Sequence, residues 1–438
     1  MTRRLIPLVV ATAVALAVVP GVPVAAPPIA HREVLPNGVV LLVAERPTVP
    51  IVAVRVFMRA GAVFEPDDRV GLANLTGSVL TRGTAGRSGP EIDDAIEFVG
   101  GSLEAGAGRD GLTASLSVLR KDLALGLDLL SDVVLAPAFP EAEVKRKVAQ
   151  IQAAIKRSEE NPDTVAARAL ARLVFPTHPY GRPVEGTIES VGRLTRGDVV
   201  AFYQRHVRPD TAIVAVVGDV TVDEARRQVL ARFGGWTRPP GPAPTVPPAT
   251  GQAPPGSATI AKELTQATIM LGRPAVRQVD PDYFPLAVAS YVLGGGSASR
   301  LYSRVRDEGG LAYAVYSYVS PGRHGASLVV SAQTRVGEVV RVTDILRDEL
   351  ARLGRDPAAA DELRLARDYL VGSFPLRLDT TAKVADFIVA IEEQGLGLDY
   401  GDRYRAGISK VTAADVQQAA ARFFRPDTFS RVVVGAPK

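Results

Sequence analysis

The sequence predicts an α+β protein built from two copies of one domain, each a largely antiparallel sheet with helices on one face. Three observations carry this prediction. Residues 194–220 match residues 411–437 at a constant spacing, Pro and Gly crowd residues 237–258 between the two copies, and strand and helix patterns mix without steady βαβ alternation. Self-similarity of this length indicates a duplicated domain rather than a short structural repeat.

The first 30 residues have the pattern of a secretory signal peptide. Arg3 and Arg4 precede an apolar run from Leu5 to Val19, and small residues broken by prolines follow. An uncleaved membrane anchor is the alternative, because the run is near the lower limit for spanning a bilayer. We expect cleavage between residues 25 and 30, no membrane span in the mature chain, and export to a periplasm or the extracellular space.

Composition excludes other classes. The chain has no cysteine, so disulfides play no part in it. Its net charge is +4, and no Lys/Arg block with interleaved aromatic residues indicates nucleic-acid binding.

The first domain is expected at 31–236 and the second at 259–438, joined by an extended linker at 237–258. Both domains open with β-branched strand patterns and continue with helix patterns. The first domain has strand patterns at 38–45 and 51–58 and helix patterns at 91–100 and 121–134. The second domain has strand patterns at 258–264 and 267–275. Each copy ends with a helix, an Arg-Pro-Asp-Thr turn and a buried strand. Thr195 and Thr412 stand three residues before Asp198 and Asp415, as reciprocal helix caps do.

Residues 71–84, "GLANLTGSVLTRGT", predict a helix with Asn74 and Ser78 on one face. Zinc peptidases of the inverted type place His, Glu and His at this spacing. Here Asn74, Gly77 and Ser78 stand in the three positions.

Two further segments, "FPTHPYGRPVEGTIESV" (175–191) and "LGGGSASRLYSRVRDEGGLAYAVYS" (293–317), follow in order. With them, the chain resembles the M16 (pitrilysin and insulinase-like) metallopeptidase family in its two-domain, processing-peptidase-like form. Active members bind zinc through both His and a Glu about 76 residues later, and the resemblance places Ala154 at that position. Asn74, Ser78 and Ala154 cannot supply three deprotonated ligands, and Gly77 cannot act as a base.

We find no other residues in the sequence that would replace the zinc ligands or the base. The four histidines are far apart in sequence; we interpret His178 as a loop hydrogen-bonding residue and His206 as a packing residue, and assign no role to His31 or His324. Glu159 and Glu160 are expected on a solvated face. Ser78 lacks the Gly-x-Ser-x-Gly elbow of a nucleophile and is interpreted as a small space-filling residue. We expect no metal in this chain.

The second half keeps what the first has lost. The resemblance implies that Arg306 and Tyr313, seven residues apart, face the active-site chamber and stabilise the oxyanion of a tetrahedral intermediate. The alternatives are a salt bridge from Arg306 to Asp307, or a helix surface position, and a strand-edge position for Tyr313. Gly294, Gly295 and Gly296 complete no phosphate-binding motif and are expected to form a flexible loop near the substrate.

The resemblance therefore implies a non-catalytic subunit that works with a zinc-bearing partner, as a heterodimer or larger assembly. Extended peptide would add as a strand to an exposed sheet edge. The alternative is a peptide-binding or structural scaffold protein of the same fold with no role in hydrolysis.

Overall fold

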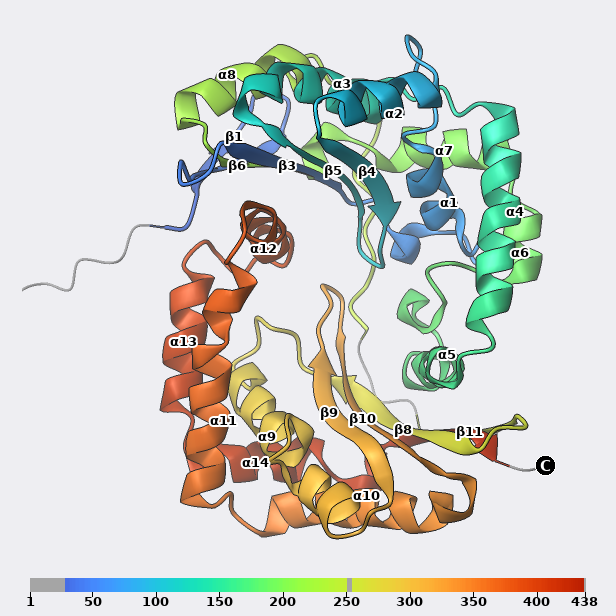
Figure 1. Ribbon diagram of the computed structural model, residues 1–438, viewed down its shortest axis with the longest axis vertical. Coiled ribbons are helices and arrows are strands. Elements are labelled where there is room, and N and C mark those ends of the chain that lie inside the picture. The colour runs from blue at the N-terminus through green and yellow to red at the C-terminus, as the bar shows by residue number, and fades with distance from the viewer. Residues whose placement is uncertain (1–27, 250–253, 437–438) are drawn as a thin grey trace, which may run out of the picture.

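The computed structural model describes residues 28–249 and 254–436. Most of the predicted signal peptide, residues 1–27, lies outside this range. The chain forms two sheets, each with helices packed over its outer face, as predicted from the duplication (Figure 1). Within the described part of the chain, no helix is both long enough and apolar enough to cross a bilayer.

The first sheet has six strands in the order β1-β2-β6-β3-β5-β4. Only the β2–β6 pair is parallel. The strands are β1 (His31–Val34), β2 (Val40–Glu45), β3 (Ile51–Met58), β4 (Ser102–Ala107), β5 (Leu112–Leu119) and β6 (Ala212–Gly218). The helices of this half are α1 (Leu72–Val79), α2 (Gly89–Phe98), α3 (Leu123–Leu135), α4 (Glu141–Ser158), α5 (Pro162–Val174), α6 (Ile188–Gly192), α7 (Arg196–His206) and α8 (Val222–Phe233).

The second sheet has five strands in the order β7-β11-β8-β10-β9, and only β7–β11 is parallel. The strands are β7 (Ser257–Ala261), β8 (Gln266–Ala275), β9 (Ala312–Ser320), β10 (Ala326–Arg335) and β11 (Ser430–Ala436). The helices are α9 (Tyr283–Gly294), a π-helix (Tyr302–Asp307), α10 (Val339–Arg355), α11 (Ala360–Gly372), α12 (Thr381–Glu393), α13 (Tyr400–Lys410) and α14 (Ala413–Phe423).

Local sequence signals explain several boundaries. Thr195 and Thr412 both form the predicted capping boxes, with Asp198 and Asp415 as reciprocal acceptors. Strand β1 was not predicted, because its four residues alternate weakly and are mostly exposed. The proposed linker is wrong at its end, since β7 begins at Ser257 and pairs with β11. The other domain boundaries stay predictions.

One helix of each half packs against the sheet of the other half. Helix α12 of the second half packs Val384, Ile388 and Val389 against β2, β3 and β6 of the first sheet. Helix α5 of the first half packs Leu170 and Val174 against the second sheet. The inner face of each sheet is therefore covered by a helix from the opposite half (Figure 1).

Polar pairs fix this exchange. Arg55 on β3 donates to Asp386 on α12 across 2.6 Å. At the opposite junction, Asp163 on α5 accepts hydrogen bonds from Thr268 at 2.7 Å and Gln333 at 2.6 Å. These charge-assisted bonds set the register of each helix on a sheet that apolar packing alone would leave free to slide.

Candidate functional site: a degenerate metal site and a retained arginine–tyrosine pair

Helix α1 carries the former metal motif, and a buried carboxylate holds its first turn. The helix begins after Gly71, whose φ of 97° favours glycine. Glu65 accepts hydrogen bonds from the backbone N–H of Gly71 at 3.1 Å and of Ala73 at 2.7 Å. Desolvation raises the pKa of Glu65 to about 7, while these two amides pull it down. Glu65 thus replaces the side-chain cap that α1 lacks.

The structure brings two of the three predicted former ligand positions together. Ser78 on α1 and Ala154 on α4 line one open groove of about 760 Å³. Asn74 lies one turn before Ser78 on α1. In the described residues, no group of three or more His, Asp or Glu side chains could hold a metal ion. A hydroxyl, an amide and a methyl group do not fit zinc, which needs deprotonated nitrogen, sulfur or oxygen ligands.

Gly77, where active enzymes carry the general base, has no room for any side chain. A Cβ at this position would stand 2.8 Å from the backbone N of Ala107 and 2.8 Å from the carbonyl carbon of Gly106. Edge strand β4 therefore packs directly on α1 at the point where a glutamate would project. The packing of the sheet edge therefore leaves no space at Gly77 for a side chain.

Replacing Gly77 by Ala should destabilise the protein by about 1–2 kcal/mol, because the overpacking penalty exceeds the gain in helix propensity. Urea unfolding measures the difference. Gly106→Ala is the matched control, since a Cβ at Gly106 meets nothing within 4 Å. Equal stability of the two variants would show that β4 moves away from α1 freely.

Arg306 and Tyr313 do lie together. Arg306 is in the π-helix, and its guanidinium carbon lies 5.2 Å from the ring centre of Tyr313 and 4.8 Å from that of Tyr302. Its Nη1 donates to the backbone carbonyl of Tyr313 at 3.4 Å. Tyr313, at the start of edge strand β9, is 77% exposed. The pair is therefore assembled, with the phenol open to solvent and the cation held between two rings.

The glycine loop differs from the prediction. Gly294 is the last residue of α9, and a Cβ there would stand 2.5 Å from the backbone N of Ser317 on β9. A Cβ at Gly295 would meet the ring of Tyr291 at 2.3 Å. The prediction of a flexible loop is wrong for Gly294, because this residue lies in α9 and lets the helix contact β9 closely. Gly295 caps the helix and packs on Tyr291 of the same helix. A Cβ added to the next residue, Gly296, would lie 3.1 Å from the hydroxyl oxygen of Tyr291.

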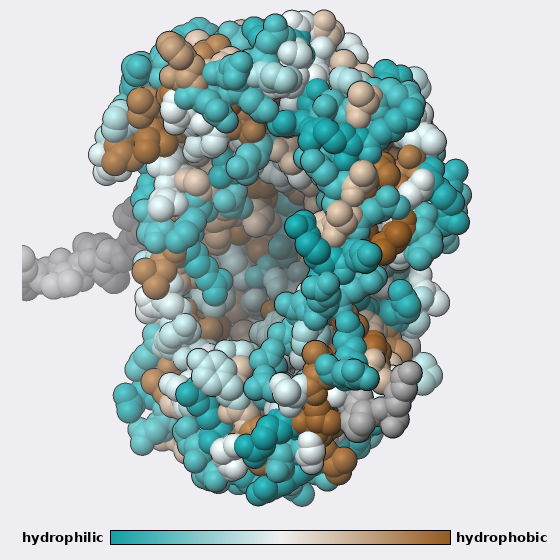
Figure 2. All heavy atoms as spheres, turned by 45° about the vertical axis from the view of Figure 1, so that its right-hand side comes forward, coloured by the Kyte–Doolittle hydropathy of each residue, from teal (hydrophilic) through white to brown (hydrophobic). Residues whose placement is uncertain are grey.

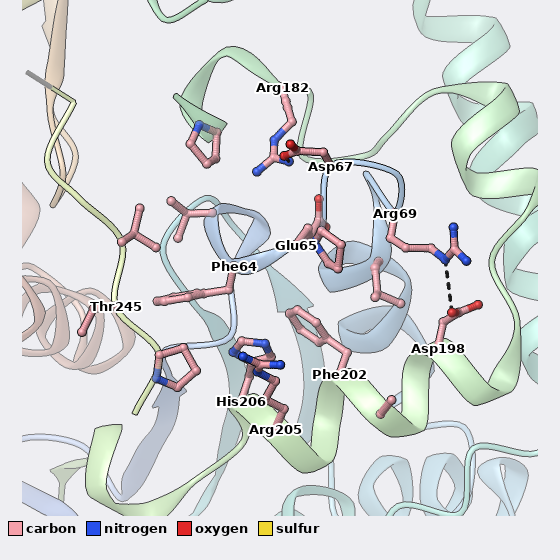
Figure 3. Close-up of a pocket in the computed structure, with 17 residues that line it drawn as sticks. Phe64, Glu65, Asp67, Arg69, Arg182, Asp198, Phe202, Arg205, His206 and Thr245 are labelled. Carbon is pink, nitrogen blue, oxygen red and sulfur yellow. Dashed lines mark hydrogen bonds and ion pairs between the residues drawn. The ribbon is translucent and has the colours of Figure 1, made fainter. Parts of the chain in front are cut away.

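A second pocket, of about 510 Å³, lies beside α1 and α7 (Figure 3). Phe64, Phe202 and His206 form its apolar side, and Arg182, Asp67 and Arg69 lie on the opposite side. The imidazole of His206 lies 4.5 Å from the ring of Phe202, centre to centre, so the prediction of a packing role is confirmed. Desolvation, aided by the charges of Arg205 and Arg208, lowers the pKa of His206 to about 4. This histidine is neutral at physiological pH.

Between the halves, a buried polar cluster surrounds Tyr180. Its hydroxyl donates to Asp110 at 2.5 Å and accepts from the backbone N–H of His324 at 3.0 Å. Nearby, Glu393 at the end of α12 lies 3.5 Å from Arg323, and desolvation raises its pKa to about 7. His178 accepts from the backbone N–H of Tyr180 at 3.1 Å, which confirms its predicted loop role.

Sequence reasoning missed the basic residues of α4. Lys147, Lys156 and Arg157 line the same groove as Ser78 and Ala154. Helical spacing was the available signal, because Lys147, Ala154 and Arg157 are separated by seven and three residues and share a face.

The fold and this site define a class: a two-domain, insulinase-like peptidase scaffold whose described residues include no metal-ligand group. The chain belongs to peptidase family M16. Residues 40–188 match the model described as insulinase (peptidase family M16), and residues 193–370 match the model of the peptidase M16 inactive domain.

Relatives agree with this assignment. The chain is 30% identical over 400 residues to an uncharacterized zinc protease of Streptomyces coelicolor, covering 89% of this chain and 86% of that protein. It is 31% identical to one of Mycobacterium leprae, covering 80% and 79%. A solved peptidase M16 inactive domain from Pseudomonas fluorescens superposes with a TM-score of 0.87 at 25% identity, covering 93% of this chain and 99% of the other. A protease from Helicobacter pylori shares the fold, with a TM-score of 0.86 at 19% identity over 93% of this chain and 99% of that one.

Proposed function

We propose that this protein is the non-catalytic, substrate-binding subunit of an exported M16 zinc peptidase. Its partner subunit carries the zinc, and this chain supplies Arg306 and Tyr313 to the partner's active site. The observation that carries the proposal is the asymmetry between the halves. Among the described residues, the first half offers no group of His, Asp or Glu side chains that could hold a metal and no room for a side chain at Gly77, while Arg306 and Tyr313 of the other half lie together.

The position of Tyr313 supports a role in a second chain's site. Its ring is open to solvent and lies beside the guanidinium of Arg306. Both groups can donate hydrogen bonds to an oxyanion. A hollow lies between the two halves of the molecule (Figure 2). Extended peptide bound at a sheet edge would bring its carbonyl groups within reach of such donors.

Peptidase assays test the proposal. The purified chain should cleave an unstructured peptide neither alone nor with added zinc, and should bind no zinc by mass spectrometry. Mixed with an M16 subunit that carries His-x-x-Glu-His from the same source, it should give strong, chelator-sensitive cleavage. Chelator-sensitive cleavage by this chain alone would overturn the proposal. If the mixture cleaves no peptide, the alternative of a scaffold protein is supported.

A further inference from the structure

The groove at the former metal position is lined by cations. Lys147, Lys156 and Arg157 from α4 line it, against one acid, Glu160. Glu159 is exposed beyond them, as predicted for a solvated face. In the family pattern, this place holds two imidazoles and a carboxylate around a metal. Here small residues, Ser78 and Ala154, leave the space open and the charge is supplied by α4.

Lys147 is the most informative of the three cations. It is half-buried, and desolvation lowers its pKa, with Arg82 and Arg146 adding to the effect. The two acids that oppose this shift are already engaged. Asp93 accepts hydrogen bonds from both terminal nitrogens of Arg82, at 3.0 and 3.1 Å. Glu143 forms an ion pair with Arg146.

Within the described residues, Lys147 consequently has no ion-pair partner of its own. A half-buried ammonium without a counterion is unfavourable, and a carboxylate entering the groove relieves that penalty. Lys156 and Arg157 likewise form no ion pair within residues 28–249 and 254–436. All three cations are thus available to a ligand.

The dimensions of the groove fit a peptide. Lys147 and Arg157 are ten residues apart on α4, which corresponds to about 15 Å along the helix. An extended chain covers that distance in about four or five residues. Two carboxylates three or four residues apart on one extended peptide can therefore reach both ends of the groove.

We propose that the dismantled metal site of this chain is a cationic groove that binds an acidic segment of the substrate peptide. The proposal rests on the substrate-binding role proposed above and specifies its substrate class. Lys147 anchors one carboxylate at the half-buried end, and Lys156 and Arg157 hold a second at the open end. Peptides with acidic residues spaced in this way are preferred over basic ones.

Fluorescence anisotropy on the purified chain tests this preference directly. The probes are labelled, unstructured peptides of about 15 residues that differ only in carrying two Glu, two Gln or two Lys at the stated spacing. The Glu peptide should bind about tenfold more tightly than the Gln peptide, and the preference should shrink between about 50 and 300 mM salt. Lys147→Gln should reduce affinity for the Glu peptide about fivefold to tenfold and leave the Gln peptide unchanged. Lys410→Gln, an exposed lysine at the end of α13, is the matched control.

Three results would overturn the proposal: equal affinity for all three peptides, an equal loss for all three in Lys147→Gln, or an effect of Lys147→Gln on assembly with the zinc subunit but none on peptide binding. The last result would assign the groove to an acidic surface of the partner. The two proposals fail separately. If the chain binds acidic peptides selectively but does not stimulate a partner, the cationic groove is supported and the peptidase role is excluded. If it stimulates cleavage regardless of substrate charge, the peptidase role is supported and the cationic groove is excluded.

Discussion

Arg306→Ala and Tyr313→Phe should each lower the peptidase activity of the mixed complex by on the order of 10²–10³, the usual effect of losing one oxyanion donor. Arg306 is held over the rings of Tyr302 and Tyr313, so its guanidinium is already oriented before substrate arrives. Donors that need no reorganisation act chiefly on the transition state. We therefore expect the loss in kcat, with KM for the peptide nearly unchanged.

Assembly and folding provide the controls for this prediction. Tyr313 is largely exposed and Arg306 makes no ion pair within the described residues, so neither change should alter the melting temperature or the formation of the complex. Arg341→Ala and Tyr369→Phe replace exposed residues on α10 and α11 and should leave turnover unaltered. Unchanged kcat in both test variants would remove the role assigned to the pair.

The protein should be more stable at mildly acidic pH than at pH 8. Glu65 and Glu393 both have a pKa raised to about 7 from the ordinary value of 4.5, chiefly because burial disfavours the charged form. The folded state then binds more protons than the unfolded state between these values, so stability falls as pH rises through 7. Each carboxyl should contribute about 2 kcal/mol between pH 8 and about 5.5.

His206 acts in the opposite direction. Its pKa is lowered from 6.5 to about 4, so its stabilising contribution is lost as pH falls below 6.5. By pH 5.5 this opposes the carboxyls by about 1 kcal/mol. The net expectation is a gain of about 2–3 kcal/mol at pH 5.5 relative to pH 8, measured by urea unfolding across the pH range.

Glu393→Gln isolates one contributor. The amide has nearly the size of the neutral acid and does not titrate, so it removes the pH dependence of a side chain that lies 3.5 Å from Arg323. The variant should lose about 2 kcal/mol of the pH-dependent change. Glu104→Gln, on the exposed side of β4, is the control. A profile identical to that of the unmodified protein would mean that Glu393 is charged at neutral pH.

Much of this architecture could be predicted from the sequence. The duplication gave the two halves, because Thr-x-x-Asp caps and Arg-Pro-Asp-Thr turns are local signals that repeat visibly. The resemblance to the M16 family paired Ala154 with Ser78, and the structure places both in one groove; their role as former ligand positions stays a prediction.

Long-range packing explains what could not be predicted. Nothing local indicates that Gly77 meets the backbone of β4 or that Gly294 meets β9, since both contacts depend on how distant elements close together. Gly294 was predicted to be part of a flexible loop, and in the structure it is a point of close approach between α9 and β9. The charge of the groove was missed for a related reason. Lys147 was not among the predicted site residues, and only the fold places it in one groove with Ser78.

The exchange of α5 and α12 has a consequence for how the molecule can move and how it can be divided. Cutting the chain between the halves would strip each sheet of the helix on its inner face and expose Leu42, Ala215 and Val217 on one side and Met270, Val329 and Val432 on the other. Neither half is then an autonomous folding unit, and the pair should unfold in one cooperative step. Opening the chain between its halves would have to break both of these helix–sheet contacts. Under the proposed function, a peptide would therefore enter by movement between this chain and its partner rather than by a hinge within the chain.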